Sequence, residues 1–310
     1  MESRAIGSLS VSVVGLGCNN FGRRVGAEQT REVVAAALDH GITLFDTADV
    51  YGGEGRSEQL LGEALGSRRD EAVVATKFGM PFDEQRRGAH PDYVHRACED
   101  SLRRLGTDRI DLYQLHAPDP EVPIAETLGA LDELVTAGKV REIGNSNFSG
   151  EQIDEAEREA RQRDTARFVV AQNRWSALSR HIEDDVVPAA RRNGLAILPY
   201  FPLASGLLTG KYRPGEDPDP SWRIATMPED RRTQLLDEQR LAKVAALEDL
   251  ARQRGRTLLE LAFGWLASQD VVASVIAGAT RPTQVAANVA AAEWRLDEDD
   301  LAAVDEITGT

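Results

Sequence analysis

Short apolar runs recur along the chain, and each is followed by a longer segment in which apolar residues repeat every three to four positions. Runs such as AVVAT, RFVVA and VASVIA are almost continuously apolar. Runs of this kind are typical of parallel strands that are covered on both faces. The pattern predicts eight strands, at Val13–Leu16, Thr43–Phe45, Ala72–Thr76, Ile110–Leu115, Val140–Gly144, Phe168–Ala171, Leu195–Pro199 and Val272–Ala277.

The segments between these strands have the periodicity of amphipathic helices. After the fourth strand, one apolar stripe is formed by Ile124, Leu128, Leu131 and Val135. Gly138 follows at the position of a C-terminal cap, where a left-handed backbone is common. Thr257 and Glu260 have the spacing of an N-terminal capping box, which predicts a helix that begins just after Thr257. A stripe after the third strand contains Cys98, so this thiol is expected to be buried and reduced.

Eight strands that alternate with helices predict either a closed barrel or an open, doubly wound sheet. The glycine-rich loops GxGxxG and GxxxxGK[ST], which bind phosphate in open sheets, are absent from the sequence. We therefore expect an α/β protein with a (β/α)8 TIM barrel, in a single domain over residues 1–310. The longest irregular stretch runs from Tyr212 to about Asp230, after the seventh strand. A helix-like stretch, Arg231–Arg254, then precedes another helix, Leu258–Ala267, so the seventh unit is expected to carry an insertion.

Charge and composition argue against several classes of binding partner. The net charge of −15 and the pI near 4.9 argue against nucleic acid or an anionic membrane, because both repel an acidic surface. Neither the two cysteines nor the five histidines have the spacing of a metal site, so no metal is expected. The sequence shows no run of about 20 apolar residues and no signal-peptide pattern, so a cytoplasmic protein is expected.

Ligands of a (β/α)8 barrel bind at the carboxyl ends of the strands, so the residues just after each predicted strand are candidates for a site. Asp46 follows the second strand, and Tyr51 lies in the next loop, in the motif FDTADVYG. Lys77 follows the third strand and His116 follows the fourth. The later strands end in Ser146 and Asn147, in Gln172, in Tyr200, and in Gly278, Ala279 and Thr280.

Each residue of the first group also has an ordinary structural role as an alternative. Asp46 could cap a strand end, Lys77 could be a solvated lysine, and His116 could be a hydrogen-bonded histidine of the core. Together, however, a carboxylate, a phenol, an ammonium and an imidazole at three successive strand ends would converge on one point at the barrel mouth. We therefore interpret Asp46, Tyr51, Lys77 and His116 as a catalytic set.

The chemistry of this set predicts a proton donor for a carbonyl group. Tyrosine has a pKa of about 10, and a lysine ammonium a few ångströms away lowers that pKa by roughly 1–3. Asp46 would keep Lys77 charged and in place, and His116 would hydrogen-bond the substrate oxygen, so that Tyr51 becomes a general acid. No residue of the set supplies a hydride, so the reducing equivalent must come from a cofactor.

The motifs that contain these residues resemble the aldo-keto reductase family. FDTADVYGGEGRSEQLLGEAL is the most specific, and VVATKFG, LYQLHAPDP, REIGNSNFS and PYFPLASGLLTGKY match as well. The resemblance covers essentially the whole chain and is closest to bacterial members that lack a C-terminal substrate-binding extension. It implies an NADP-dependent oxidoreductase that reduces an aldehyde or ketone to an alcohol. The hydride would come from nicotinamide C4 of NADPH and the proton from Tyr51, with Lys77 and Asp46 as its tuning pair and His116 as the orienting group.

The resemblance also implies a cofactor site that extends across the strand ends. Ser146, Asn147 and Gln172 resemble the clamp of the nicotinamide carboxamide, and Tyr200 corresponds to the aromatic residue that stacks on the nicotinamide ring. The loop around the pyrophosphate is matched by Leu203, Ser205, Gly206, Leu208 and Lys211. The adenosine end is matched by Gly278, Thr280, Arg281, Gln284 and Asn288.

The adenosine end departs from the best-known pattern of the family. A Lys-Ser pair that often contacts the 2′-phosphate is here Gly278 and Ala279, and a glutamate beside the adenine-binding asparagine is here Ala287. We therefore assign the 2′-phosphate to Arg281 as a hypothesis, and NADH stays open as a second cofactor.

The family resemblance implies that the substrate is a small carbonyl compound, and we expect the loops at the barrel mouth to contact it. The expected positions are Phe21, Val50, Phe78, Trp222 and Arg223. Trp222 is equally consistent with an anchor that holds the irregular loop in place.

Two other functions remain as alternatives. An NADPH-binding sensor or a channel-associated regulatory subunit can keep the same fold and site. A Schiff-base aldolase would use Lys77 as its nucleophile, although a neighbouring Asp46 would keep that amine protonated and unreactive.

Overall fold

The computed structural model describes residues 1–212, 215–220 and 222–309. Eight parallel strands form one sheet in the spatial order β10-β3-β4-β5-β6-β7-β8-β9. These strands are β3 (Val14–Gly17), β4 (Leu44–Asp46), β5 (Val73–Phe78), β6 (Ile110–Leu115), β7 (Val140–Ser146), β8 (Phe168–Gln172), β9 (Ala196–Ile197) and β10 (Val275–Gly278). All eight predicted strands are confirmed, with ends displaced by at most three residues.

Hydrogen bonds between the two outermost strands of this order close the sheet into a barrel. The Ile197 N–H donates to the Val271 carbonyl at 2.7 Å, and the Ala273 N–H donates to the Ile197 carbonyl at 3.1 Å. Further along, the Ile276 N–H donates to the Pro199 carbonyl at 3.2 Å. β9 is short because part of its pairing is with the irregular segment before β10. The predicted (β/α)8 barrel is therefore confirmed.

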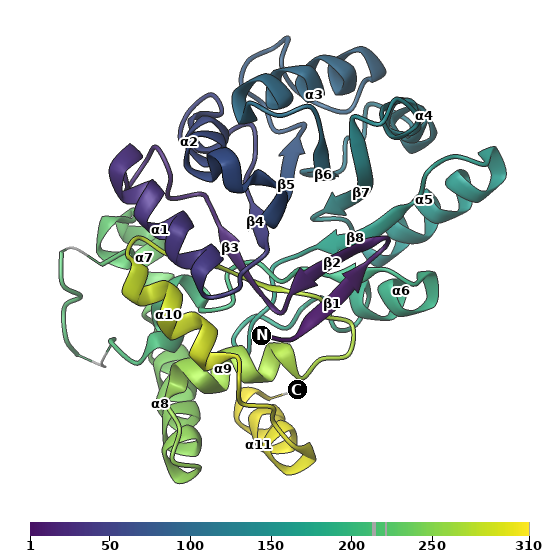
Figure 1. Ribbon diagram of the computed structural model, residues 1–310. Coiled ribbons are helices and arrows are strands. Elements are labelled where there is room, and N and C mark those ends of the chain that lie inside the picture. Colours follow the sequence, from purple (N-terminus) through teal and green to yellow (C-terminus); the bar gives the residue numbers. More distant parts are fainter. Residues whose placement is uncertain (213–214, 221, 310) are drawn as a thin grey trace.

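Helices follow the strands and form the outer layer of the molecule (Figure 1). They are α1 (Ala27–Asp39), α2 (Arg56–Leu65), α3 (Pro91–Leu105), α4 (Ile124–Thr136), α5 (Gly150–Arg163), α6 (Val186–Asn193), α7 (Glu229–Leu235), α8 (Glu238–Gln253), α9 (Leu258–Ala267), α10 (Pro282–Ala291) and α11 (Glu298–Thr308), with 3-10 turns η1 (Gly66–Glu71), η2 (Ala204–Thr209) and η3 (Ile224–Thr226). The predicted capping box of Thr257 and Glu260 is present at the start of α9. α7 and α8 precede α9, which confirms the insertion in the seventh unit. Within the described ranges, no helix is both long and apolar enough to cross a membrane.

An N-terminal hairpin closes one end of the barrel. Its strands, β1 (Ser3–Ile6) and β2 (Leu9–Ser12), pair in antiparallel fashion and lie across the barrel in Figure 1. The buried hairpin side chains Ile6, Leu9 and Val11 belong to one apolar cluster with residues that line the inside of the barrel. The hairpin therefore leaves the other end of the barrel, at the carboxyl ends of the strands, as the end where a site is expected.

The alternation of side chains along the strands decides what lines the barrel, because residues two apart point to the same face. The apolar cluster under the hairpin includes Leu44, Ala75, Leu112 and Val170. Two positions further along the same strands come the buried side chains of Asp46, Lys77, Gln114 and Gln172. The barrel interior thus changes from an apolar layer to a polar layer at the carboxyl ends of its strands.

α2, which follows the loop of Tyr51, packs so closely on the end of α3 that Gly62 has no room for a side chain. A Cβ atom at Gly62 would lie 2.1 Å from the carbonyl oxygen of Leu105. Gly62→Ala is therefore expected to push the two helices apart and lower the free energy of unfolding by about 1–3 kcal/mol. Urea unfolding measures the loss. Gly129→Ala in α4 is the control, because its Cβ would meet nothing within 4 Å; equal stability of the two variants would contradict the prediction.

Both cysteines are buried and free. Cys98 lies on the buried face of α3, as predicted, and Cys18 follows β3. Burial raises the pKa of the Cys98 thiol to about 12, and burial together with the nearby Asp46 charge raises the pKa of Cys18 as well. Because a thiol reacts as its thiolate, both side chains are inert at neutral pH.

Candidate active site

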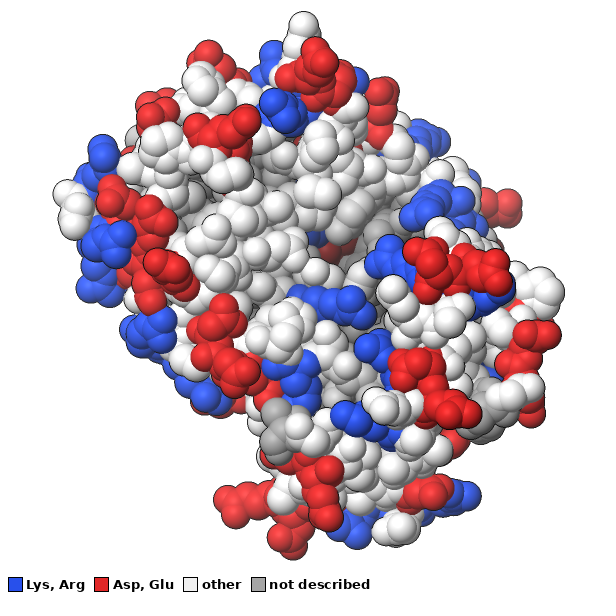
Figure 2. Space-filling model, turned by 180° about the vertical axis from the view of Figure 1, so that it is seen from behind, with Lys and Arg blue, Asp and Glu red and all other residues white. Residues whose placement is uncertain are grey.

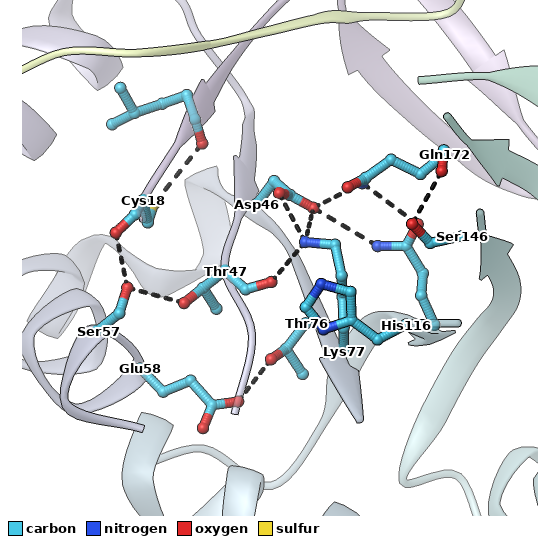
Figure 3. A network of polar contacts seen from close by, with 12 residues as sticks. Cys18, Asp46, Thr47, Ser57, Glu58, Thr76, Lys77, His116, Ser146 and Gln172 are labelled. Carbon is cyan, nitrogen blue, oxygen red and sulfur yellow. Dashed lines mark hydrogen bonds and ion pairs between the residues drawn. The ribbon is translucent and has the colours of Figure 1, made fainter. Parts of the chain in front are cut away.

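Asp46 and Lys77 form a buried ion pair inside the barrel mouth. Asp46 ends β4, and Lys77 lies near the end of the adjacent strand β5. The Lys77 Nζ donates to the two carboxylate oxygens of Asp46 at 2.8 and 2.7 Å and to the Thr47 carbonyl at 2.8 Å (Figure 3). Lys77 is 1% exposed and Asp46 is 3% exposed. All three hydrogen atoms of the ammonium thus have acceptors within the protein.

Two glutamine amides surround the same carboxylate. The Gln172 Nε2 donates to Asp46 Oδ1 at 2.8 Å, and the Gln114 Nε2 lies 3.5 Å from the same oxygen. These contacts hold the carboxylate in one orientation beneath the mouth. They also mean that the amide nitrogen of Gln172 is engaged by Asp46 in this structure.

Tyr51 and His116 face each other above the ion pair. The centroids of their rings are 5.8 Å apart and the ring planes meet at 79°. The Lys77 Nζ lies 5.1 Å from the centroid of the Tyr51 ring. Tyr51 and His116 are partly exposed, whereas the ion pair is buried. The structure therefore brings the four predicted residues together, with the phenol and the imidazole nearest to solvent.

The surroundings fix which of these groups carry a proton. Burial lowers the pKa of Lys77, but the charges of Asp46 and Tyr51 outweigh burial and raise it overall, so the amine stays an ammonium. The Lys77 charge lowers the pKa of Tyr51, as we expected, but burial raises this pKa by more, so the pKa lies above its usual value. At neutral pH the Tyr51 phenol is consequently protonated.

His116 is neutral for a related reason. Burial and, to a smaller extent, the Lys77 charge together lower the pKa of its imidazole to about 3. Its Nδ1 atom is buried and has no hydrogen-bond partner among the described residues. A protonated phenol and a neutral imidazole therefore face the mouth together, and both can donate a hydrogen bond to one oxygen atom placed between them.

The next strand ends form a hydrogen-bonded row around the mouth. The Ser146 Oγ donates to the Gln172 carbonyl at 2.8 Å, and the Asn147 Nδ2 donates to the His116 carbonyl at 2.9 Å. The Tyr200 hydroxyl donates to Asn147 Oδ1 at 2.7 Å. The structure thus joins predicted residues at and just after the ends of β7, β8 and β9 into one polar edge of the mouth.

Cationic side chains gather beside this mouth. The pKa of Lys211 is lowered by burial and by the charges of Arg24 and Arg281, and the pKa of Arg223 is lowered by burial and by Arg24 and Arg23. Figure 2, seen from the side opposite to Figure 1, shows Lys and Arg side chains beside a hollow in the surface. Mutual repulsion of cations in an acidic protein indicates a site for an anion. Arg24 was missing from our prediction; its signal is the pair of arginines in NNFGRR after the first strand.

The other predicted cofactor positions lie in the turn after β9 and at the start of α10. Ser205 and Gly206, within η2, have left-handed backbones with φ of 62° and 101°. The same turn contains Leu203 and Leu208, and Gly278 ends β10. The Thr280 N–H donates to Gln284 Oε1 at 2.8 Å, Arg281 immediately precedes α10, and Asn288 is buried on that helix.

Two of the predicted substrate residues are fully buried. Phe21 and Phe78 are both 0% exposed, and the Phe78 ring stacks on Tyr113 with centroids 4.6 Å apart. Phe78 is the residue after Lys77 on β5, so it points to the opposite face of the strand, toward the helices. In this conformation neither ring offers a surface to a substrate.

The remaining substrate positions are partly exposed, and Trp222 also has the contacts of an anchor. Val50 and Arg223 are both partly exposed. Trp222 packs edge-on against Tyr212, with ring centroids 5.1 Å apart, and the Lys211 Nζ lies 5.0 Å from its ring centroid. Met80, three residues beyond Lys77, is 38% exposed in the loop after β5.

The sequence matches known proteins along its whole barrel. A family model described as the aldo/keto reductase family matches residues 13–308. The aldo-keto reductase YhdN of Bacillus subtilis is 37% identical over 282 residues, which cover 87% of this chain and 80% of that protein. The uncharacterized oxidoreductase YrpG of the same organism is 34% identical over 311 residues, with 96% and 93% covered. A probable voltage-gated potassium channel subunit beta of Arabidopsis thaliana is 34% identical over 292 residues, with 92% and 88% covered.

Proposed function

Because the chain belongs to the aldo/keto reductase family, we propose that it is an NADP-dependent oxidoreductase that reduces the carbonyl group of an aldehyde or ketone to an alcohol. The family and the names of the relatives support an oxidoreductase. The observation that carries the finer proposal is the convergence of Tyr51 and His116 above the Asp46–Lys77 pair. It provides a protonated donor and a second hydrogen-bond donor at one point of the mouth.

Each residue of the set has a defined task in this reaction. A bound NADPH would supply the hydride to the carbonyl carbon. Tyr51 donates its phenolic proton to the carbonyl oxygen as negative charge develops there. Lys77 stabilises the phenolate that remains, and Asp46 keeps the ammonium charged and in place. His116 orients the oxygen by donating a hydrogen bond to it.

The residues of the mouth fit an anionic dinucleotide. Lys211 and Arg281 supply positive charge where the resemblance places the pyrophosphate and the adenosine, and their repulsion would be relieved by phosphate groups. Ser146, Asn147 and Tyr200 form a polar edge with one aromatic face beside the catalytic set. We propose that this edge holds the nicotinamide and that the protein acts in the cytoplasm on small carbonyl compounds.

Arg281→Ala tests the choice between the two nicotinamide cofactors. The variant is expected to weaken NADPH binding about tenfold, because a charge-assisted hydrogen bond to the 2′-phosphate is lost, and to leave NADH binding nearly unchanged. Fluorescence titration of both cofactors against wild type and variant measures the ratio. An unchanged ratio would remove Arg281 from this role.

The proposed reaction is tested by the consumption of NADPH, followed by absorbance, with aromatic aldehydes, short α-dicarbonyls and keto-sugars. Turnover of any of these carbonyls supports the reductase. Absence of NADPH binding would show that the cofactor proposal is wrong.

The relative named as a probable potassium channel subunit beta favours a second candidate, an NADPH-binding regulatory subunit or sensor. Protein that binds NADPH tightly but oxidises it with no carbonyl of the panel would support this candidate. The third function that we considered, a Schiff-base aldolase, is disfavoured because Lys77 is buried as an ammonium between three acceptors. Borohydride trapping of an adduct at Lys77 would be needed to revive it.

A further inference from the structure

Asp49 is a buried carboxyl group to which none of the preceding roles applies. It lies in the loop that connects Asp46 to Tyr51, and it is 1% exposed. Neither of its carboxyl oxygens has a hydrogen-bond partner among the described residues. Buried carboxylates are normally paired or hydrogen-bonded, because an isolated charge inside a protein is very costly. This side chain therefore needs an explanation.

The charged groups around Asp49 are already matched to other partners. Glu58 of α2, which is 0% exposed, accepts a hydrogen bond from Arg104 Nε of α3 at 2.6 Å. It accepts another from the hydroxyl of Thr76, as Figure 3 shows. Lys77 of β5 is paired with Asp46. One cation therefore accompanies each of the other two carboxylates, and within the described part of the chain no ion pair includes Asp49.

Two phenols among the described residues also interact with Asp49. Tyr113 of β6 and Tyr93 of α3 are both buried, and the Asp49 charge contributes to the raised pKa of each. The Tyr113 hydroxyl also lacks a hydrogen-bond partner among the described residues. Neutral phenols do not compensate a negative charge, so burial and Glu58 outweigh the more distant cations and the balance favours an uncharged Asp49 carboxyl.

The backbone couples Asp49 to the catalytic set. The Asp49 N–H donates to the carbonyl of Lys77 at 3.1 Å, while the Lys77 ammonium binds the carbonyl of Thr47 in the same loop. Tyr51 comes two residues later, and its N–H donates to the Ala48 carbonyl at 3.1 Å. Asp49 points into the helix layer and Tyr51 into the mouth, so a movement that exposed one side chain would displace the other.

We infer that Asp49 is a positioning residue for the proposed reaction: its uncharged carboxyl keeps the loop of Tyr51 packed against Lys77, and its ionisation draws that loop toward water and away from the mouth. Burial, followed by the charge of Glu58, raises the pKa of Asp49 to about 8, although Arg104, the backbone N–H of Val50 and Lys77 lower it in part. The carboxyl is thus protonated at neutral pH and ionises just above it. A displacement of about 1 Å at a reacting group costs roughly a hundredfold in rate, so a small movement is sufficient.

The test is the pH dependence of kcat/KM for carbonyl reduction in wild type and Asp49→Asn. The amide has the shape of the uncharged acid and cannot ionise. In wild type the rate at pH 9 is expected to be about tenfold below its value at pH 7, because a group with a pKa of about 8 is then about nine-tenths ionised. In Asp49→Asn the rate at pH 9 is expected to be about equal to the rate at pH 7, because the ionisation of residue 49 is removed and Tyr51 titrates at higher pH. The rate at pH 9 divided by the rate at pH 7 is thus expected to be about tenfold higher in Asp49→Asn than in wild type.

Asp111→Asn is the matched control. Asp111 is also a 1% exposed aspartate, but it is paired with Arg69. It lies near the start of β6, whereas the mouth is at the carboxyl end of that strand. Its substitution should leave the shape of the pH profile as in wild type. Superimposable profiles of wild type and Asp49→Asn would overturn the inference, because a merely structural Asp49 would change stability and not the profile.

The inference rests on the proposed reductase, and an infrared measurement separates the two. Wild type at neutral pH should show a protonated-carboxyl band that disappears between pH 7 and pH 9 and is missing in Asp49→Asn. The measurement needs no substrate. In wild type it also does not depend on whether a variant folds. Its absence would overturn the assignment of Asp49, whereas absence of carbonyl turnover alone would overturn the proposed function.

Discussion

Tyr51→Phe is expected to lower kcat for carbonyl reduction by about 10²–10⁴-fold, the usual contribution of a positioned general acid. The ring keeps its place against His116 and above Lys77, so the shape of the mouth is unchanged. Only the proton donor is lost. Stopped-flow measurement of NADPH oxidation under single-turnover conditions gives the rate of the chemical step directly.

Two controls decide how this result is interpreted. Cofactor affinity and thermal unfolding of Tyr51→Phe should both resemble wild type, because the Lys77 ammonium keeps the Asp46 carboxylate and the Thr47 carbonyl as its acceptors when the hydroxyl is lost. A variant that keeps near-wild-type turnover would show that the assigned role of Tyr51 is wrong. A variant that loses cofactor binding would instead show that Tyr51 belongs to the binding site.

Lys77→Met is expected to be the most destabilising substitution in the mouth, with a loss of about 3–5 kcal/mol in the free energy of unfolding. The reason is that Asp46 would remain as a buried carboxylate without its counterion. Turnover should fall as well, because the phenolate of Tyr51 would lose its stabilising charge. Equilibrium unfolding in urea measures the first effect, and the NADPH assay measures the second.

The double variant Lys77→Met/Asp46→Asn separates these effects. The asparagine is neutral and its carbonyl still accepts from Gln172, so most of the lost stability should return. Turnover should stay low, because the ammonium is still missing. A double variant as unstable as Lys77→Met would mean that the lysine stabilises the fold through contacts other than its pairing with Asp46.

The sequence was sufficient for the barrel because two periodicities alternate clearly along it. Runs such as AVVAT have the composition of strands buried on both faces, and the four proposed catalytic residues were selected by the rule that sites lie at the carboxyl ends of such strands. The predicted strand Leu195–Pro199 was too long, since its regular pairing covers only Ala196–Ile197. Its hydrogen bonds to an irregular segment depend on barrel closure, which no local pattern reveals.

The finer features of the site depend on tertiary burial. Alternation along β5 could have excluded Phe78, because it directly follows an inward-facing lysine. The raised pKa of Tyr51 and the uncharged Asp49 could not be predicted, since both result from how deeply the loop lies between the barrel and the helices. Nor does the sequence show that Glu58 occupies Arg104 and so leaves Asp49 without a cation.

The two inert cysteines make this protein a convenient host for a spectroscopic reporter. Because neither Cys18 nor Cys98 is exposed to thiol reagents, a single new cysteine on the surface would be labelled selectively. Met80 is a suitable position, since it is exposed and only three residues beyond Lys77. A fluorophore attached there would sense when the mouth fills and empties, and would report the dwell time of each ligand in real time.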